Sequence, residues 1–220
     1  SVSAVHKWEG NAEMPDLFDA DDPRHFTFLK GPTEGKLKDE ARVEEGIRFL
    51  QTRKDKANPF MLFLGVGLPH CPYTCPEPFY SMYSPEDIPP LRAFEHSDKP
   101  AFYSRIREYR GINQCDEHIF RRVMAVYLGM ISYVDHLLGR VLDTLEETGQ
   151  DRNTVLVAFS DHGDWAGDYG LVEKWPSALN DNLTRIPMIV RTPECKPGHV
   201  VCEPVESFDI MPTTLELAGI

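Results

Sequence analysis

The chain has 220 residues, a length that suits one domain or one large piece of a domain. Hydrophobic residues make up 41% and charged residues 26% of it, so the chain can bury a core and is not intrinsically disordered. The formal net charge of −12 excludes nucleic acid as a main partner, because no basic stripe is available to neutralise phosphates. The sequence has no apolar run long enough to cross a bilayer and no signal peptide.

The first part of the chain is predicted to be loop, then helix, then strand. Residues 1–36 are rich in Asp, Pro and Gly and show little periodicity, which indicates mostly loop. Apolar residues recur at helical spacing over 38–53, and Asn58-Pro59 ends that helix. The run FMLFLGVG at 60–67 is continuously apolar, which is typical of a strand buried on both faces.

The second part alternates helix and strand again after an irregular stretch. Residues 69–115 carry many prolines and aromatics and are predicted to form an excursion over the top of a sheet. The pattern over 117–147 predicts a long helix. The runs TVLVAF at 154–159 and PMIVRT at 187–192 predict strands, and a short helix is expected over 209–217.

This alternation predicts the α/β class, with a largely parallel sheet flanked by helices and present here as a partial domain. Ligands gather at the carboxyl ends of the strands in such sheets. The run 60–67 leads to His70, and the run 154–159 leads to Asp161 and His162. We expect these two loops to open on the same edge of the sheet.

The cysteines are odd in number and contain no Cys-x-x-Cys pair, which argues against a structural zinc site. They are Cys71, Cys75, Cys115, Cys195 and Cys202. We interpret them as free, buried thiols. Disulfides between Cys71 and Cys75, or between Cys195 and Cys202, stay open as alternatives in an oxidising compartment.

Asp161 and His162 follow a predicted strand directly. A carboxylate and an imidazole are half of a workable divalent-metal site, and Gly163 permits the turn that aims both at one ion. The alternative is a polar loop in which Asp161 caps the following turn. Lys174 is by itself a surface lysine, unless the loop before it folds back over the metal. His70 is either a loop histidine with satisfied hydrogen bonds or a donor to a leaving group.

The chain resembles the sulfatase family of the alkaline-phosphatase superfamily in the stretch VLVAFSDHGDWAGDYGLVEKW, residues 155–175. That family has an apolar strand, Ser-Asp-His-Gly or Ser-Asp-Asn-Gly, a glycine-rich turn and then Lys. Three further stretches agree in order: FMLFLGVGLPHCPY, YLGMISYVDHLLGRVLDTLEETG, and the end of the chain from RIPMIVRTP. The stretch PHCPYTCPEPFYSMYSPEDIPP is most similar to the iduronate-2-sulfatase-like branch, and the resemblance covers residues 37–220.

The resemblance implies roles for four residues. Asp161 and His162 would bind a metal, Lys174 would bind a sulfate oxygen, and His70 would contact the sulfate or assist the leaving oxygen. The implied metal is Ca²⁺, with Mn²⁺ or Zn²⁺ as alternatives that an imidazole ligand favours. The implied nucleophile is a formylglycine, and the implied substrate is a small-molecule or oligosaccharide sulfate ester. A periplasmic, secreted or lysosomal location is expected from the family, and the oligomeric state stays open.

The chain departs from the family pattern at several places. It has no Cys/Ser-x-Pro-x-Arg nucleophile motif, and CKPGH ends in His199 where that motif has Arg. The amino-terminal aspartate pair is absent, HKWEG has Glu9 in place of a family histidine, and Tyr169 stands where many members have His. We therefore interpret residues 1–220 as the C-terminal part of a sulfatase catalytic domain that lacks its nucleophile region. We expect this chain alone to be inactive.

Two other functions are compatible with the pattern. One is a phosphonate or phosphate ester hydrolase of the same superfamily, and the other is a non-catalytic binding protein that kept the fold. Aromatic side chains could stack on sugar rings or pack the loops on themselves. They are Trp165, Trp175 and the aromatics of residues 73–83.

Overall fold

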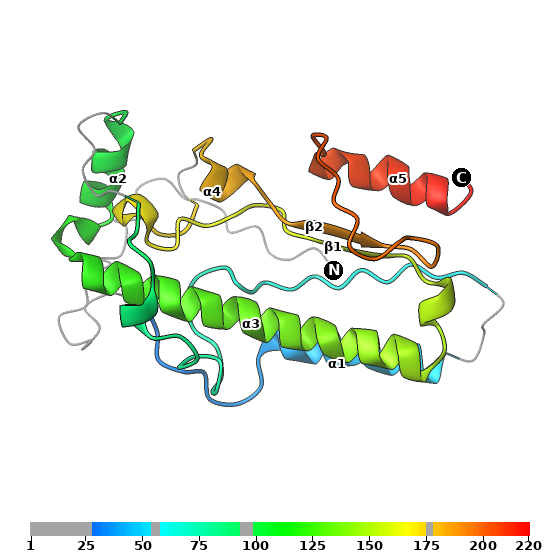
Figure 1. The fold of residues 1–220 in the computed structure, drawn as a ribbon. Helices are drawn as coiled ribbons and strands as arrows, with labels where there is room; N and C mark the ends of the chain where they lie inside the picture. Colours follow the sequence, from blue (N-terminus) through cyan, green and yellow to red (C-terminus); the bar gives the residue numbers. More distant parts are fainter. Residues whose placement is uncertain (1–27, 54–57, 93–98, 175–177) are drawn as a thin grey trace, which may run out of the picture.

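The structure is a computed structural model that describes residues 28–53, 58–92, 99–174 and 178–220. A long helix forms the centre of the fold. This helix, α3 (Glu117–Glu147), has 31 residues, and α1 (Lys38–Thr52) lies alongside it (Figure 1). The bounds agree with the two predicted helices to within one residue, so both predictions are confirmed. The described residues begin at residue 28, so most of the predicted loop over residues 1–36 lies outside them.

The two helices pack through an apolar stripe and are linked at its margin by polar contacts. Periodic apolar residues of both helices are buried in one cluster, among them Val43, Leu50, Phe120, Val123, Met130 and Leu137. At the margin, the Tyr133 hydroxyl donates to Glu40 at 3.2 Å, and Arg140 pairs with Glu40 at 3.4 Å. Burial of the stripe supplies most of the stabilisation, because partly exposed ion pairs contribute little.

The first turn of α3 is capped by Asp116, whose carboxylate accepts a hydrogen bond from the Ile119 amide at 3.0 Å. We predict that Asp116→Ala lowers the free energy of unfolding by about 1 kcal/mol, because the amide loses its acceptor. Chemical denaturation of the protein would measure the change. Asp116→Ser should restore most of the loss, and an unchanged unfolding midpoint for Asp116→Ala would contradict the assigned cap.

The remaining elements are short and lie in the connections. The excursion at 69–115 is not wholly irregular, since it contains the helix α2. The elements are η1 (Pro85–Asp87), α2 (Phe102–Tyr109), η2 (Ile112–Gln114), η3 (Asp151–Asn153), η4 (Asp168–Gly170), α4 (Asp181–Thr184), η5 (Ser207–Asp209) and α5 (Ile210–Leu217). The predicted last helix over 209–217 therefore begins one residue later, after a single 3₁₀ turn.

The apolar run 60–67 is an extended segment, but it forms no strand ladder with any other described residue. Its side chains alternate in burial. Leu62 and Leu64 face the core, whereas Met61 and Phe63 are 77% and 74% exposed. Burial on both faces is therefore wrong for the described chain, because only the α1 side supplies covering residues. Gly46 of α1 makes room for this contact, since a Cβ there would lie 2.7 Å from the Leu64 side chain.

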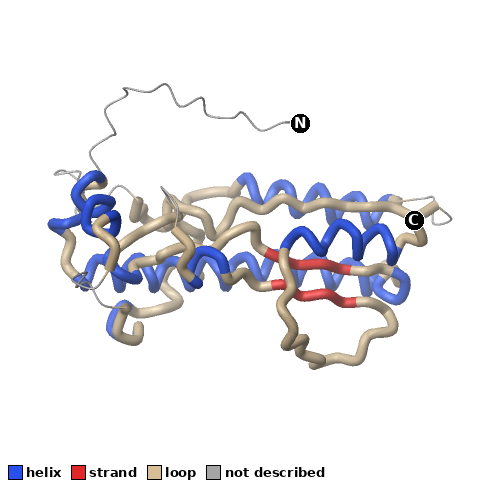
Figure 2. The backbone as a smooth tube through the Cα atoms, turned by 90° about the horizontal axis from the view of Figure 1, so that it is seen from above, coloured by secondary structure: helices blue, strands red, loops and turns tan. Residues whose placement is uncertain are grey.

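The strands β1 (Leu156–Phe159) and β2 (Met188–Arg191) form a two-stranded antiparallel sheet, drawn in red in Figure 2. Leu156 pairs with Arg191, and Phe159 pairs with Met188. The pairing corrects the parallel arrangement expected for these runs. A parallel pair needs a crossover, usually through a long helix, and the chain between these strands instead turns back through loops and the four-residue α4. Both strands are partly exposed, so their predicted full burial is also wrong here.

All five cysteines are free, and no helix of the described residues is long and apolar enough to cross a membrane. Cys71, Cys75 and Cys115 are at least partly buried, whereas Cys195 and Cys202 are exposed. The prediction of free thiols is thus confirmed for all five. The prediction of burial is confirmed for Cys75 and Cys115, and it is wrong for Cys195 and Cys202. Neither short-loop disulfide is present.

Burial raises the pKa of both the Cys75 and Cys115 thiols to about 11 from an ordinary 9.0. We predict that both resist alkylation at about pH 8 in the folded protein, because only the thiolate reacts. Unfolded thiols ionise first, so these two groups make folding less favourable as pH rises from 9.0 to about 11. Mass spectrometry after alkylation, with denatured protein as the control, would test this; equal rates in both samples would contradict it.

Candidate active site

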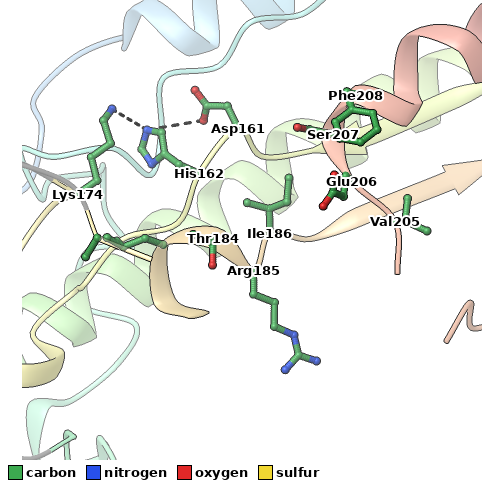
Figure 3. A pocket seen from close by; sticks show the side chains of 12 residues that line it. Asp161, His162, Lys174, Thr184, Arg185, Ile186, Val205, Glu206, Ser207 and Phe208 are labelled. Atoms are coloured by element: carbon green, nitrogen blue, oxygen red, sulfur yellow. Dashed lines mark hydrogen bonds and ion pairs between the residues drawn. The ribbon is translucent and has the colours of Figure 1, made fainter. Parts of the chain in front are cut away.

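The four site residues predicted from the sequence lie together beyond the end of β1. Lys174 Nζ is 2.7 Å from His162 Nε2 and 3.4 Å from His70 Nε2. The two imidazole rings meet edge to face, with centroids 5.8 Å apart. Asp161 Oδ1 lies 3.7 Å from His162 Nε2, and Figure 3 shows this carboxylate, the imidazole and the lysine in a row. The loops that follow 60–67 and β1 therefore open toward each other.

Backbone carbonyls fix the orientation of both imidazoles. His70 Nδ1 is 2.8 Å from the Cys71 carbonyl oxygen, and His162 Nδ1 is 2.7 Å from the Gly163 carbonyl oxygen. A carbonyl only accepts, so each Nδ1 carries the hydrogen and donates it. Each Nε2 is then left with a lone pair for the Lys174 ammonium group, which donates to both rings. The site thus presents two oriented imidazoles around one cation.

Gly163 allows the chain to approach α4 very closely. A Cβ at this position would lie 1.9 Å from the Asn182 carbonyl oxygen, which no real side chain tolerates. The Gly163 amide donates to the Leu183 carbonyl at 2.8 Å, and the Ser160 hydroxyl donates to the His162 carbonyl at 2.6 Å. The turn expected from the sequence is therefore also a packing requirement, and it fixes the direction in which His162 leaves the strand.

A pocket of about 580 Å³ opens beside this group (Figure 3). Asp161, His162 and Lys174 line one side of it, and Glu206 and Phe208 line the opposite side. The Asp161 side chain is 85% exposed, so its carboxylate is open to solvent and to a ligand. The stretch CKPGH, which only partly matches the family's nucleophile motif, lies in the exposed segment after β2 and contributes no residue to the lining of this pocket.

The segment that carries His70 is held by the start of α1. The buried Asp39 carboxylate accepts hydrogen bonds from the Gly67 amide at 3.0 Å and the Leu68 amide at 2.9 Å. Arg42 donates to the other oxygen of the same carboxylate at 2.7 Å. These contacts anchor the chain just ahead of His70. Asp39 is not among the site residues predicted from the sequence, because an acid in the first turn of a helix is common without any such partner.

An acid next to Lys174 completes the surroundings of His70. Glu173 Oε2 pairs with the buried Arg110 at 2.9 Å, and Glu173 Oε1 lies 3.9 Å from His70 Nε2. The ligand atoms of His70, Cys71 and Glu173 lie within 4.8 Å of one another. Burial, and then the Glu173 and Asp164 carboxylates, raise the pKa of the Cys71 thiol well above its ordinary value. A thiol that stays neutral is a poor metal ligand, because the thiolate is the form that binds a metal.

The aromatic side chains of the glycine-rich loop pack on each other. Trp165 is 1% exposed and contacts Tyr169 and Tyr103 at ring-centroid distances of 5.6 and 5.8 Å. Stacking of Trp165 on a sugar is therefore excluded in this conformation, and Tyr169 does not line the 580 Å³ pocket. Within residues 73–83, Tyr73 is fully buried. Trp175 lies outside the described residues.

Comparison with known proteins extends the similarity beyond these residues. A sulfatase from Formosa agariphila is 33% identical over 76% of this chain and 34% of its own length. Iduronate 2-sulfatase from Mus musculus is 32% identical over 73% of this chain and 31% of its own length. The chain thus spans about a third of the length of these curated relatives.

A solved structure and a family model complete the comparison. The phosphonate monoester hydrolase from Silicibacter pomeroyi superposes with a TM-score of 0.69 at 30% identity, over 92% of this chain and 44% of that one. The expected fold class, an α/β fold of the alkaline-phosphatase and sulfatase type present as a partial domain, is thereby confirmed. The sulfatase family model matches residues 3–220, so the similarity begins earlier than the expected residue 37. The chain belongs to the sulfatase family.

Proposed function

We propose that this chain is part of a metal-dependent sulfatase that hydrolyses sulfate esters, with carbohydrate sulfates as the expected substrates. The observation that carries the proposal is the contact of the Lys174 ammonium group with His162 and His70, beside Asp161. A sulfate ester presents several anionic oxygens around one sulfur, and such a group matches a cluster of cationic and hydrogen-bonding side chains. By family, we expect a periplasmic, secreted or lysosomal protein.

Asp161 and His162 are the proposed metal ligands. Their donor atoms are 3.7 Å apart, which lets both bind one ion with ligand bonds of about 2.0 to 2.6 Å. The Gly163 carbonyl holds the Nδ1 hydrogen of His162, so that Nε2 offers its lone pair. A bound ion would stabilise negative charge on the sulfate oxygens. Two ligands do not complete a site, and we propose that the others belong to the full-length protein outside residues 1–220.

Lys174 and His70 are the proposed sulfate-binding residues. Lys174 would release its hydrogen bond to His162 and turn its ammonium group toward a sulfate oxygen. His70 contacts the same ammonium through Nε2, and we propose that this nitrogen takes up a proton and donates it to the leaving oxygen when Lys174 turns to the sulfate. Cleavage of the S–O bond leaves an alcohol oxygen that needs such a proton. The formylglycine nucleophile expected from the family would lie outside this chain.

We propose Ca²⁺ as the metal, by family, with Mn²⁺ or Zn²⁺ as alternatives. An exposed carboxylate suits Ca²⁺, whereas one imidazole ligand favours the transition metals. Titration calorimetry of the metal-free, full-length protein with each ion would separate them. The strongest binding is expected for Ca²⁺, and Asp161→Ala should weaken it.

A phosphonate or phosphate ester hydrolase remains the second candidate, because the Silicibacter pomeroyi structure has that activity in its name and is 30% identical. The test is to assay the full-length protein with 4-nitrophenyl sulfate, phenyl 4-nitrophenyl phosphonate and 4-nitrophenyl phosphate, with and without a chelator. Fastest turnover of the sulfate, lost with the chelator, supports the proposal. Preference for the phosphonate favours the second candidate, and the absence of both turnover and metal binding indicates a binding protein.

A further inference from the structure

The loop between His162 and Lys174 has an unusual backbone. Three non-glycine residues in it have positive φ angles: Ala166 at 46°, Tyr169 at 58° and Glu173 at 63°. Side chains other than glycine are disfavoured in this left-handed region, so the surrounding structure must hold them there. The backbone amides of Ala166 and Glu173 donate to the same carboxylate, which has no role in the proposed chemistry.

This carboxylate is Asp164, whose Oδ1 accepts three hydrogen bonds. The donors are the Tyr73 hydroxyl at 2.8 Å, the Ala166 amide at 2.7 Å and the Glu173 amide at 3.1 Å. The Glu173 amide also lies 2.9 Å from the Tyr73 hydroxyl oxygen. Tyr73 and Ala166 are buried, so water cannot replace these bonds. The backbone at two of the three left-handed residues is thus held by one oxygen atom.

The same oxygen connects the three chain segments that carry the site. Asp164 follows His162 by two residues, Glu173 directly precedes Lys174, and Tyr73 follows His70 by three residues. We propose that Asp164 is a positioning residue that sets the distances between His70, His162 and Lys174. This proposal deepens the proposed function and rests on it for its effect on turnover. Asp164 itself has no hydrogen bond to any of the three side chains; its partners are Tyr73, Ala166 and Glu173.

The chemistry of Asp164 suits this task. Three donors converge on one atom, and a carboxylate accepts without offering a hydrogen that would oppose any of them. Burial raises the pKa of the Asp164 carboxyl above its ordinary value, while the hydrogen bonds from Tyr73, Ala166 and Glu173 lower it. An asparagine oxygen can accept the same three bonds. Alanine accepts none, so the Ala166 amide and the Tyr73 hydroxyl hydrogen lose their acceptor and the Glu173 amide keeps only the Tyr73 hydroxyl oxygen.

The test uses Asp164→Ala, Asp164→Asn and Tyr73→Phe in the full-length protein, with Asp116→Ala as the control. The control removes the helix cap of α3, so it lowers stability, while Asp116 itself has no hydrogen bond to Asp164, Tyr73 or the described loop between His162 and Lys174. We expect Asp164→Ala to lower kcat with 4-nitrophenyl sulfate by about 10- to 100-fold, since displacement of reacting groups by about an ångström has an effect of that order. Asp164→Asn should recover most of the loss, and the control should keep its kcat.

A second measurement does not depend on turnover. The imidazole ¹⁵N chemical shifts of His70 and His162 report their hydrogen bonds, and we expect both to change in Asp164→Ala or Tyr73→Phe and to stay the same in the control. If the wild-type protein turns over no sulfate ester, the proposed function fails, while these shifts still decide the role of Asp164. The positioning role of Asp164 would be overturned by unchanged imidazole shifts in Asp164→Ala and Tyr73→Phe, or by a loss of kcat in Asp116→Ala equal to that in Asp164→Ala. If Asp164→Ala does not fold, Tyr73→Phe decides by the same shifts.

Discussion

Replacing Gly163 with alanine in the full-length protein is expected to lower the turnover of a sulfate ester by about 100-fold or more. The added Cβ would lie 1.9 Å from the Asn182 carbonyl oxygen, so either α4 or the end of β1 must move. Movement of β1 displaces Asp161 and His162, and movement of α4 opens the wall of the pocket. Steady-state kinetics with 4-nitrophenyl sulfate, together with a thermal melt, would measure the effect.

Gly139 provides the matched control for this substitution. It lies in α3, and apart from its chain neighbours and the backbone of the helix itself, a Cβ there would have no atom within 4 Å. Gly139→Ala should leave turnover unchanged and raise stability by roughly 0.5 to 1 kcal/mol, because alanine loses less conformational entropy in a helix. Full activity in Gly163→Ala would show that the loop accommodates the extra atom and that the close approach has no part in shaping the site.

Removal of the Lys174 ammonium group is expected to lower kcat/KM for a sulfate ester by about 10²- to 10³-fold, or about 3 to 4 kcal/mol. The reason is that Lys174→Ala takes away the cation that contacts both Nε2 atoms and that we propose to bind a sulfate oxygen. Lys174→Arg should recover only part of the loss, since a planar guanidinium cannot copy a compact ammonium between two rings. Competition by inorganic sulfate would measure the binding component.

Lys36 is the matched control for the lysine. It pairs with Glu44 at the surface near the start of α1 and has no contact with the pocket. Because exposed ion pairs contribute little to stability, Lys36→Ala should behave as the wild-type protein in both assays. If Lys174→Ala keeps its kcat/KM and its affinity for sulfate, Lys174 has no part in binding the ester.

Local patterns predicted the helices well and the strands less well. The bounds of α1 and α3 follow from a spacing of apolar residues that only the chain itself determines. The burial of 60–67 and of β1 depends on what covers them, and the sequence of a strand does not say which of its faces is covered. Whether β2 runs parallel or antiparallel to β1 likewise depends on the path of the chain between them, which the apolar pattern of the two strands does not determine.

The candidate site shows the same division. His70, Asp161, His162 and Lys174 lie in stretches that resemble motifs of the family, so the sequence could predict them as site residues before any contact was known. Asp164 stands inside the same stretch, SDHGDW, but its partner Tyr73 is 91 positions away. An acid after a glycine has many possible partners, and neither spacing nor composition indicates which one it meets. Hydrogen bonds across such separations are visible only in the folded chain.

The alternating exposure along residues 60–67 has a practical consequence. Met61 and Phe63 point away from the core, and the backbone between them forms no ladder with other described residues. The strand β2 adds Ile189, which is 62% exposed. Apolar side chains along unpaired backbone are a template for strand addition by a second molecule. We therefore predict that residues 1–220 on their own associate through these edges, and that charged substitutions at positions 61 and 63 reduce this association, which light scattering would measure.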